Sequence, residues 1–330
     1  MQSNQLGIVV IGRNEGLRLV DCLASLRPYA DRVVYVDSGS DDDSVANAKK
    51  SGATVVQLDT SIPFTAARAR NEGFAALMRK HPDCRYVQFI DGDCQLNSTW
   101  LDVALPFMDT HEEVAVVCGR RRERFPEKSV YNRLCDIEWD TPIGEALACG
   151  GDSVMRVDAF QTVGGFTAGL MAGEEPELCA RLRGNGWKIW RLDAEMTLHD
   201  AAMLRFGQWW QRTVRSGYGG AEVYWLRKSS SQSGSRIYGR ETASVIFWSA
   251  AIPLVIVVST FARPYLFGLV AIYPLQICRI AVRRRPLNRE SWGYGLLIML
   301  GKFAAFYGVM KYWWRRSMGR DTEMIEYKRT

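Results

Sequence analysis

The sequence is poor in histidine and lacks the cysteine spacing of a metal-binding fold. Its three histidines are far apart, at His81, His111 and His199, and none of its eight cysteines forms a C-x-x-C pair. These absences argue against a zinc cluster, and the mostly apolar neighbours of the cysteines are typical of reduced thiols in a cytosolic compartment. Residues 1–15 lack a basic start and a long apolar run, so we expect no signal peptide.

The chain also lacks a large excess of charge of one sign. Its 330 residues include 42 Lys plus Arg and 36 Asp plus Glu, which gives a formal net charge of +6. This modest value does not indicate a nucleic-acid partner. A hydrophobic fraction of 47% and a charged fraction of 24% exclude a disordered chain, a collagen and a coiled coil.

The first two thirds of the chain alternate short apolar runs with helical patterns. Near-continuous apolar strands between helices predict an α/β fold with a mostly parallel sheet covered by helices. The expected strands are 6–11, 32–36, 54–58, 86–90, 114–119, 150–155 and 188–192, and the expected helices are 17–26, 44–50, 65–80, 101–108, 157–163 and 173–185. Glu15, Asp37 and Asp91 each follow a strand, at the edge where open α/β sheets bind ligands. Four arginines within 120–124 suit either an anionic ligand or a solvated loop.

Asp91-Gly92-Asp93 follows the expected strand at 86–90 directly. The glycine permits a tight turn and the close approach of a ligand. Hard carboxylate oxygens suit Mg²⁺ or Mn²⁺, which also bind phosphate oxygens. A plain turn is the alternative for such a common pattern, but its place at the end of a buried strand favours a metal site.

Five motifs, in this order along the chain, together resemble a family 2 glycosyltransferase with the GT-A fold over about residues 6–215. They are Ile11-Gly12-Arg13-Asn14-Glu15, Val36-Asp37-Ser38-Gly39-Ser40, Ala69-Arg70-Asn71-Glu72-Gly73, Asp91-Gly92-Asp93, and Gly173-Glu174-Glu175-Pro176-Glu177-Leu178 followed by Arg181-Leu182. The resemblance implies transfer of a sugar from a nucleotide-sugar with inversion at the anomeric carbon.

The resemblance also implies roles for residues of these motifs. Glu15 and Asp37 would hold the base and ribose of a nucleotide, expected to be uridine, with Asn71 nearby. Asp91 would face the ribose or the metal, and Asp93 would bind the Mg²⁺ or Mn²⁺ that bridges the diphosphate. His199 falls where some relatives place a further metal ligand, although a lone histidine is more often structural.

The acceptor hydroxyl must lose a proton as it attacks, so the reaction needs a general base. Relatives usually have Glu-Asp where this chain has Glu174-Glu175, and Glu175 occupies the Asp position. We therefore expect Glu175 to be the base, with Glu174 as the alternative. Arg212 and Arg215 could grip the diphosphate as a cationic clamp, or could form an exposed helix face at a membrane.

Residues 243–262 contain no charge, a length that matches the roughly 20 residues needed to cross a bilayer. A second apolar stretch at 265–282 contains only Arg279, and Arg263-Pro264 separates the two. This pattern predicts a helical hairpin at about 243–282. The basic flanks predict, by the positive-inside rule, that the catalytic domain faces the cytoplasm at the inner membrane. These flanking residues are Arg227, Lys228, Arg236, Arg240, Arg283, Arg284 and Arg285.

A third apolar segment, at about 291–312, has Lys302 near its middle and basic residues after it. A third crossing would place that basic tail outside, so we expect an interfacial or re-entrant helix with Trp313 and Trp314 at the headgroups. The expected division is a GT-A catalytic domain at 1–228, a linker at 229–240 and a membrane region at 241–330.

These features together predict a membrane-anchored glycosyltransferase in cell-surface glycan synthesis. Its expected partners are a nucleotide-sugar donor, a lipid-linked or polysaccharide acceptor, and membrane lipids. One alternative is a sugar nucleotidyltransferase, but residues 12–16 contain too little glycine for the phosphate loop of that class. A membrane-tethered binding or scaffold protein is the non-enzymatic alternative, and Asp91, Asp93 and Glu175 argue against it.

Overall fold

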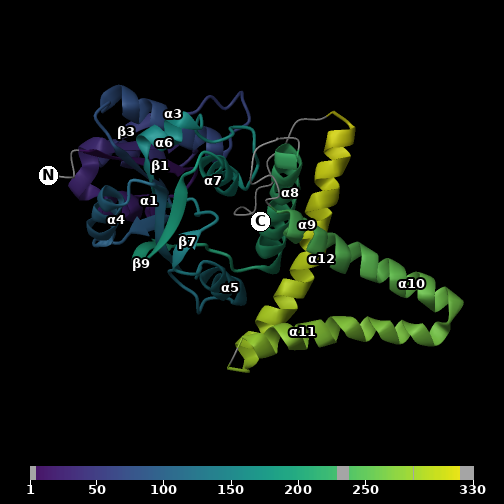
Figure 1. The fold of residues 1–330 in the computed structure, drawn as a ribbon. Helices are drawn as coiled ribbons and strands as arrows, with labels where there is room; N and C mark the ends of the chain where they lie inside the picture. Colours follow the sequence, from purple (N-terminus) through teal and green to yellow (C-terminus); the bar gives the residue numbers. More distant parts are fainter. Residues whose placement is uncertain (1–4, 229–237, 285, 320–330) are drawn as a thin grey trace.

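The structure is a computed structural model that describes residues 5–228, 238–284 and 286–319. Most of the expected linker at 229–240 lies outside these residues. The N-terminal part of the chain forms an α/β body, and the C-terminal helices lie to one side of it (Figure 1).

The body is built on one nine-stranded sheet in the order β3-β2-β1-β4-β8-β6-β9-β5, with β7 paired to β9. The strands are β1 (Leu6–Gly12), β2 (Val33–Asp37), β3 (Thr54–Gln57), β4 (Tyr86–Asp91), β5 (Cys94–Leu96), β6 (Val114–Glu123), β7 (Gly144–Ala146), β8 (Ser153–Arg156) and β9 (Lys188–His199). Strands β1 to β4 pair in parallel, as do β6 and β9. Strands β5, β7 and β8 are antiparallel to their neighbours. The sheet is therefore mixed, and the expected parallel arrangement holds mainly for its N-terminal half.

Helices cover both faces of the sheet, which explains the near-continuous apolar strands. Every residue of β2 is buried, and so is every residue of β1 except Gly12. The helices of the body are α1 (Leu17–Ser25), the short 3₁₀ helix η2 (Arg27–Arg32), α2 (Ser44–Lys50), α3 (Ala66–Lys80), α4 (Trp100–Thr110), α5 (Val130–Glu138), α6 (Val157–Thr162) and α7 (Glu174–Gly184). Because β1, β2 and β4 run in parallel, the loops after them meet at one edge of the sheet.

Two strands are longer than the sequence pattern indicates, and both extensions reach the site. Strand β6 continues through Arg120, Arg121 and Arg122, so these three arginines are strand residues rather than part of a solvated loop, and Arg124 follows the end of the strand. Arg120 is buried and pairs with Asp136 at 3.1 Å. Strand β9 continues to His199, which pairs in register with Cys94. Ion pairs such as Arg122–Glu195 and His199–Asp93 stabilise charged side chains that made both extensions look like loops.

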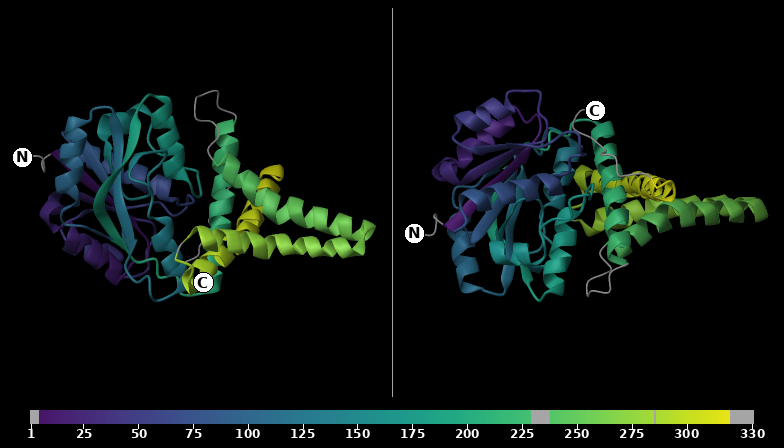
Figure 2. Two further views of the ribbon diagram at one scale, coloured as in Figure 1. Left: turned by 60° about the horizontal axis from the view of Figure 1, so that its bottom comes forward. Right: turned by 90° about the horizontal axis from the view of Figure 1, so that it is seen from above.

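The C-terminal helices include a hairpin that projects far from the body (Figures 1 and 2). Its first arm consists of α9 (Gly239–Ile246), a π-helical turn η3 (Phe247–Ala251) and α10 (Ile252–Ala262). Its second arm consists of the 3₁₀ helix η4 (Pro264–Ala271) and α11 (Ile272–Arg283), and the chain then forms α12 (Arg289–Ser317). The described residues contain three helices long and apolar enough to cross a membrane, at Gly239–Ala262, Pro264–Arg283 and Arg289–Ser317.

Helix α8 (Phe206–Lys228) connects the body to these C-terminal helices. It packs along α12, and the two backbones approach closely at glycines. A Cβ atom on Gly308 would lie 2.1 Å from the carbonyl oxygen of Val214, and one on Gly217 would lie 2.2 Å from that of Ala305. Only glycine fits at these contacts, so α12 is held against α8 in one defined arrangement.

Candidate active site

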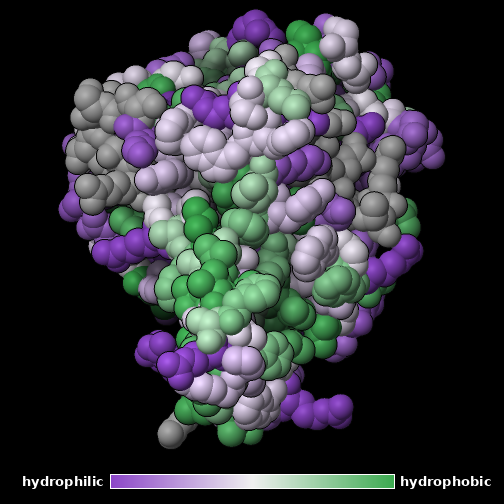
Figure 3. Space-filling model, turned by 90° about the vertical axis from the view of Figure 1, so that its right-hand side faces the viewer, coloured by the Kyte–Doolittle hydropathy of each residue, from purple (hydrophilic) through white to green (hydrophobic). Residues whose placement is uncertain are grey.

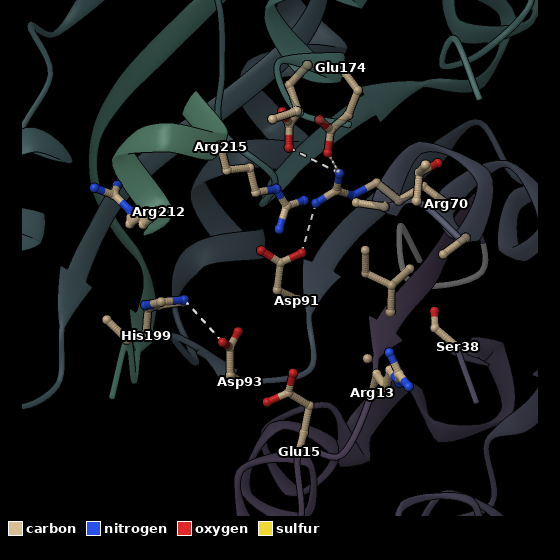
Figure 4. A pocket seen from close by; sticks show the side chains of 18 of the residues that line it. Arg13, Glu15, Ser38, Arg70, Asp91, Asp93, Glu174, His199, Arg212 and Arg215 are labelled. Atoms are coloured by element: carbon tan, nitrogen blue, oxygen red, sulfur yellow. Dashed lines mark hydrogen bonds and ion pairs between the residues drawn. The ribbon is translucent and has the colours of Figure 1, made fainter. Parts of the chain in front are cut away.

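A pocket of about 550 Å³ opens at the edge of the sheet where β1 and β4 end (Figure 4). Side chains from strands, loops and helices far apart in the sequence converge on it. The charged and polar residues that line it include Arg13, Glu15, Arg18, Ser38, Arg70, Asp91, Asp93, Arg121, Glu174, Glu175, His199, Arg212 and Arg215.

Asp91, at the end of β4, is held between two arginines. Its Oδ1 accepts a hydrogen bond of 2.8 Å from Arg70, and its Oδ2 lies 3.3 Å from a guanidinium nitrogen of Arg121. Burial raises the pKa of Asp91, but Arg70 and Arg121 lower it by more, so the carboxylate stays charged. Arg121 is fixed in turn by the fully buried Asp152, at 2.7 Å.

Arg70, on α3, contacts the two candidate bases as well as Asp91. One of its terminal nitrogens lies 2.9 Å from Glu174 Oε1 and 3.1 Å from Glu175 Oε1. Figure 4 labels Arg70 and Glu174. Both glutamates stand in the first turn of α7, whose helix begins after Gly173 in a left-handed backbone conformation with φ of 83°. The amide groups at the start of a helix favour negative charge there.

The two glutamates differ in environment. The side chain of Glu174 is 6% exposed and that of Glu175 is 14% exposed, so Glu175 is the more accessible from the pocket. Burial and the neighbouring Glu174 raise the pKa of Glu175 to about 7, although Arg70 acts in the opposite direction. A carboxylate with a pKa near 7 can accept a proton at neutral pH.

Asp93 and His199 form a buried pair on the opposite wall of the pocket from α7. Asp93 Oδ2 lies 3.3 Å from His199 Nε2, and Glu123 Oε2 lies 3.7 Å from the other ring nitrogen, Nδ1. The described residues give Nδ1 no hydrogen bond. Burial lowers the pKa of His199, but Asp93 and Glu123 raise it by more.

The donor atoms of this pair fit a divalent ion. Asp93, His199 and Cys94 have potential ligand atoms within 4.8 Å of one another. A carboxylate oxygen and an imidazole nitrogen are suitable ligands for Mn²⁺, and the remaining positions can be filled by diphosphate oxygens or water. Burial raises the pKa of the Cys94 thiol well above its usual range, so this group is a poor ligand. Both oxygens of Asp91 already contact arginines, which leaves Asp93 as the better placed aspartate.

Glu15 lines the pocket, whereas Asp37 supports it from behind. Glu15 pairs with Arg18 at 2.8 Å. Asp37 is 1% exposed, and its carboxylate accepts hydrogen bonds from the backbone amides of Gly39 and Ser40. These bonds shape the turn that presents Ser38, and Asp37 itself is absent from the pocket wall.

Asn71 also lies away from the pocket wall. Its side chain makes two hydrogen bonds to the backbone of Phe166, at 2.8 and 2.9 Å. Arg212 and Arg215, by contrast, reach the pocket from α8. Arg212 pairs with Glu138 at 3.0 Å, and Arg215 donates to the carbonyl oxygen of Met171.

Four charged residues of the site were not singled out from the sequence. Arg70 lies in the motif at residues 69–73, directly before Asn71, and Arg121 lies among the arginines at 120–124. The sequence pattern therefore contained an indication of both residues. No sequence pattern indicated Asp152 or Glu123. Both carboxylates are buried, and a carboxylate is stable in a buried position only when cationic or hydrogen-bonding partners from elsewhere in the fold surround it, which the local sequence does not show.

The fold resembles that of GT-A glycosyltransferases. A structure of the mannosyltransferase PcManGT from Pyrobaculum calidifontis, in complex with GDP-Man and Mn²⁺, matches with a TM-score of 0.59 at 14% identity, over 94% of this chain and 88% of that chain. Residues 1–349 of TarS from S. aureus, in complex with UDP-GlcNAc, match with a TM-score of 0.52 at 14% identity, over 96% of this chain and 92% of that chain. At these identities the likeness shows the fold.

The sequence comparison agrees with the fold. Residues 7–162 match the family model described as Glycosyl transferase family 2. A TPR repeat-containing protein of Synechococcus elongatus is 36% identical over 72 residues, which are 22% of this chain. The match spans 17% of that relative's length.

Proposed function

We propose that this protein is a membrane-anchored inverting glycosyltransferase that moves a sugar from a nucleotide-sugar to a lipid-linked or polysaccharide acceptor. The proposal rests on the placement of two groups on different walls of the pocket. The Asp93–His199 pair lies on one wall, and the carboxylate of Glu175, with a pKa of about 7, lies on another. A sugar held between them would have its leaving group on one side and its attacking hydroxyl on the other.

Glu175 is the proposed general base. Its raised pKa means that it can take the proton of the acceptor hydroxyl as the new glycosidic bond forms. Glu174 is the weaker candidate because it is more buried and closer to the Arg70 guanidinium. Arg70 holds both carboxylates in place through their Oε1 atoms.

Asp93 and His199 would hold Mg²⁺ or Mn²⁺. When bound, such an ion neutralises the negative charge that the departing diphosphate gathers. The side chain of Asp93 is 3% exposed, so its carboxylate has little freedom to turn away from the pocket. Neighbouring Asp91 would contact the ribose rather than the ion, since its charge is already balanced by Arg70 and Arg121.

The loops after β1 and β2 would bind the nucleotide. Glu15 lies at the pocket wall and can accept hydrogen bonds from a base or a ribose. Asp37 and Asn71 would contribute indirectly, because their side chains shape the turn at Ser38 and fix the loop at Phe166. We retain a uridine nucleotide as the proposal, and the neighbours that bind UDP-GlcNAc and GDP-Man make GDP the alternative to test.

Arg212 and Arg215 would form the cationic clamp on the diphosphate. Both line the pocket, although each also contacts a group of the protein itself. Arg212 is bound to an exposed glutamate that a diphosphate could displace. The clamp comes from α8, the helix that connects the body to the C-terminal helices.

The hairpin would anchor the protein in the inner membrane with the catalytic domain in the cytoplasm. Its arms expose large apolar side chains to their surroundings, for example Leu254, Phe261 and Leu275, which are 64%, 87% and 68% exposed. A bilayer would cover this surface, and the basic flanks favour a cytoplasmic position for its ends.

A donor panel tests the proposal. The purified full chain, in detergent with Mn²⁺, is incubated with UDP-, GDP- and dTDP-linked sugars, and the released nucleoside diphosphate is measured. We expect slow hydrolysis of one donor class that is lost in Asp93→Asn. A nucleotidyltransferase would instead form a nucleotide-sugar from a nucleoside triphosphate and a sugar phosphate, and a scaffold protein would show neither reaction.

A further inference from the structure

Helix α12 carries an exposed apolar stripe along most of its length. The members of the stripe follow one another at intervals of three or four residues and are each at least 36% exposed. They are Trp292, Leu296, Leu300, Phe303, Tyr307, Met310 and Trp314. At about 100° per residue they fall within an arc of about 80° on the helix surface, so they form one continuous face.

Packing against α8 fixes the direction in which the stripe points. Ala304, Gly308 and Tyr312 are buried on the opposite side of α12, and the close contact at Gly308 prevents rotation of the helix. The Tyr312 ring meets the ring of Tyr218 of α8 edge-on, with centroids 5.4 Å apart. The stripe therefore faces away from α8.

The hairpin runs at a steep angle to α12 (Figures 1 and 2). Its arms, of 24 and 20 residues, correspond to about 36 and 30 Å of helix, enough for a hydrocarbon core of about 30 Å. When the hairpin crosses a bilayer along its own axis, α12 runs along the membrane surface. The hairpin and α12 cannot both cross the membrane in this arrangement.

Charge and aromatic residues at the two ends of α12 fit a surface with anionic headgroups. Arg283 and Arg289 are exposed near its start, and Arg316 is exposed near its end. Trp292 and Trp314 stand at the two ends of the stripe, where the amphipathic indole ring suits the headgroup level. Figure 3, viewed from the side on which the hairpin projects, shows hydrophobic residues gathered over the projecting C-terminal helices, the hairpin included, with hydrophilic residues around them.

We propose that α12 lies in the headgroup layer of an anionic phospholipid bilayer, with the stripe toward the acyl chains, and does not cross the membrane. Because α8 packs directly on α12, this position would hold Arg212 and Arg215 at about one helix diameter, roughly 10 Å, from the headgroups. The pocket would then lie close to the headgroup layer, from which the head of a lipid-linked acceptor could extend to the donor sugar. This last step rests on the proposed sugar transfer, whereas the position of α12 does not.

Spin-label depth measurements on the full chain test the proposal. The chain is placed in bilayer nanodiscs of phosphatidylcholine and phosphatidylglycerol, with Cys278→Ser as the background because the other seven cysteines are buried. Single labels are introduced by Leu296→Cys, Tyr307→Cys and Trp314→Cys. Val257→Cys in the hairpin serves as the deep reference, and the exposed Glu127→Cys in the body serves as the aqueous reference.

We expect the three stripe labels to show the same shallow depth, accessible to oxygen and shielded from a water-soluble nickel complex. A label at Tyr307 deeper than those at Leu296 and Trp314, and close to the depth at Val257, would mean that α12 spans the bilayer and would overturn the proposal. Three labels as accessible to nickel as Glu127→Cys would overturn it as well. Donor hydrolysis in the same samples reports separately on the proposed catalytic function.

Discussion

Replacing Glu175 with glutamine should increase stability and abolish most activity, and the gain in stability should depend on pH. Burial and repulsion from Glu174 raise the pKa of Glu175 from 4.5 to about 7 in the folded protein. A carboxyl whose pKa is raised by folding destabilises the folded state once it ionises. The stability it contributes is fully present below pH 4.5 and is lost as the pH rises through 7.

The size of this effect follows from the two pKa values. A rise from 4.5 to about 7 corresponds to about 3 kcal/mol at high pH. Glutamine cannot ionise, so Glu175→Gln should match the wild type near pH 4.5 and be more stable by about 3 kcal/mol at pH 8. For a domain of about 200 residues, 1 kcal/mol shifts Tm by about 2–4 °C, so the difference in Tm should reach about 6–12 °C.

Thermal unfolding of both proteins in detergent between pH 4.5 and 8 measures this difference. The exposed Glu127→Gln controls for the loss of one negative charge. Activity provides the second measurement, because loss of a general base costs about 10²–10⁴-fold in rate. The wild-type rate should fall about tenfold per pH unit below pH 7. A stability difference that stays constant with pH, or a variant with normal turnover, would refute the assignment of Glu175.

Three further predictions concern the metal, the buried ion pairs and the helix contact. Asp93→Asn should remove the stabilisation by Mn²⁺, which for the wild type is about 2.7 kcal/mol at 100 times Kd, and unchanged Mn²⁺-dependent Tm values would contradict the metal assignment. Arg121→Met should cost about 3–5 kcal/mol because it leaves the buried Asp152 without its cation, whereas Arg122→Met breaks an exposed pair and should cost less than about 1 kcal/mol. Unfolding by denaturant measures both variants, and an equal loss of unfolding free energy in the two would contradict the role of Arg121 as the cation that balances buried Asp152. Gly308→Ala should lower Tm by several degrees, whereas Gly301→Ala, whose added Cβ would lie 3.6 Å from its nearest neighbour, should not.

The fold could be predicted from the sequence wherever local patterns dominate. The helix at Ser44–Lys50 matches its expected bounds, and the parallel strands β1, β2 and β4 match to within one residue at either end. The later strands were harder, because β6 and β9 continue through charged residues that long-range ion pairs stabilise. The antiparallel pairing of β8 with β4 and β6 is likewise set by tertiary packing.

The candidate site could be predicted where a motif follows a strand. Glu15, Asp91 and Asp93 reach the pocket as such an arrangement predicts. Asp37 and Asn71 belong to two other motifs of the same set, but their side chains bind backbone groups of neighbouring loops, which a sequence pattern does not distinguish from ligand binding.

The most direct test of the central proposal is sugar transfer to a membrane acceptor. Full-length wild-type protein, Asp93→Asn and Glu175→Gln are each incubated with labelled nucleotide-sugar, Mn²⁺ and a membrane lipid extract, and the label in the lipid fraction is measured. The proposed function predicts labelled lipid with the wild type and a loss of at least about 10²-fold with either variant. No labelled lipid with any donor, or equal labelling by all three proteins, would contradict it.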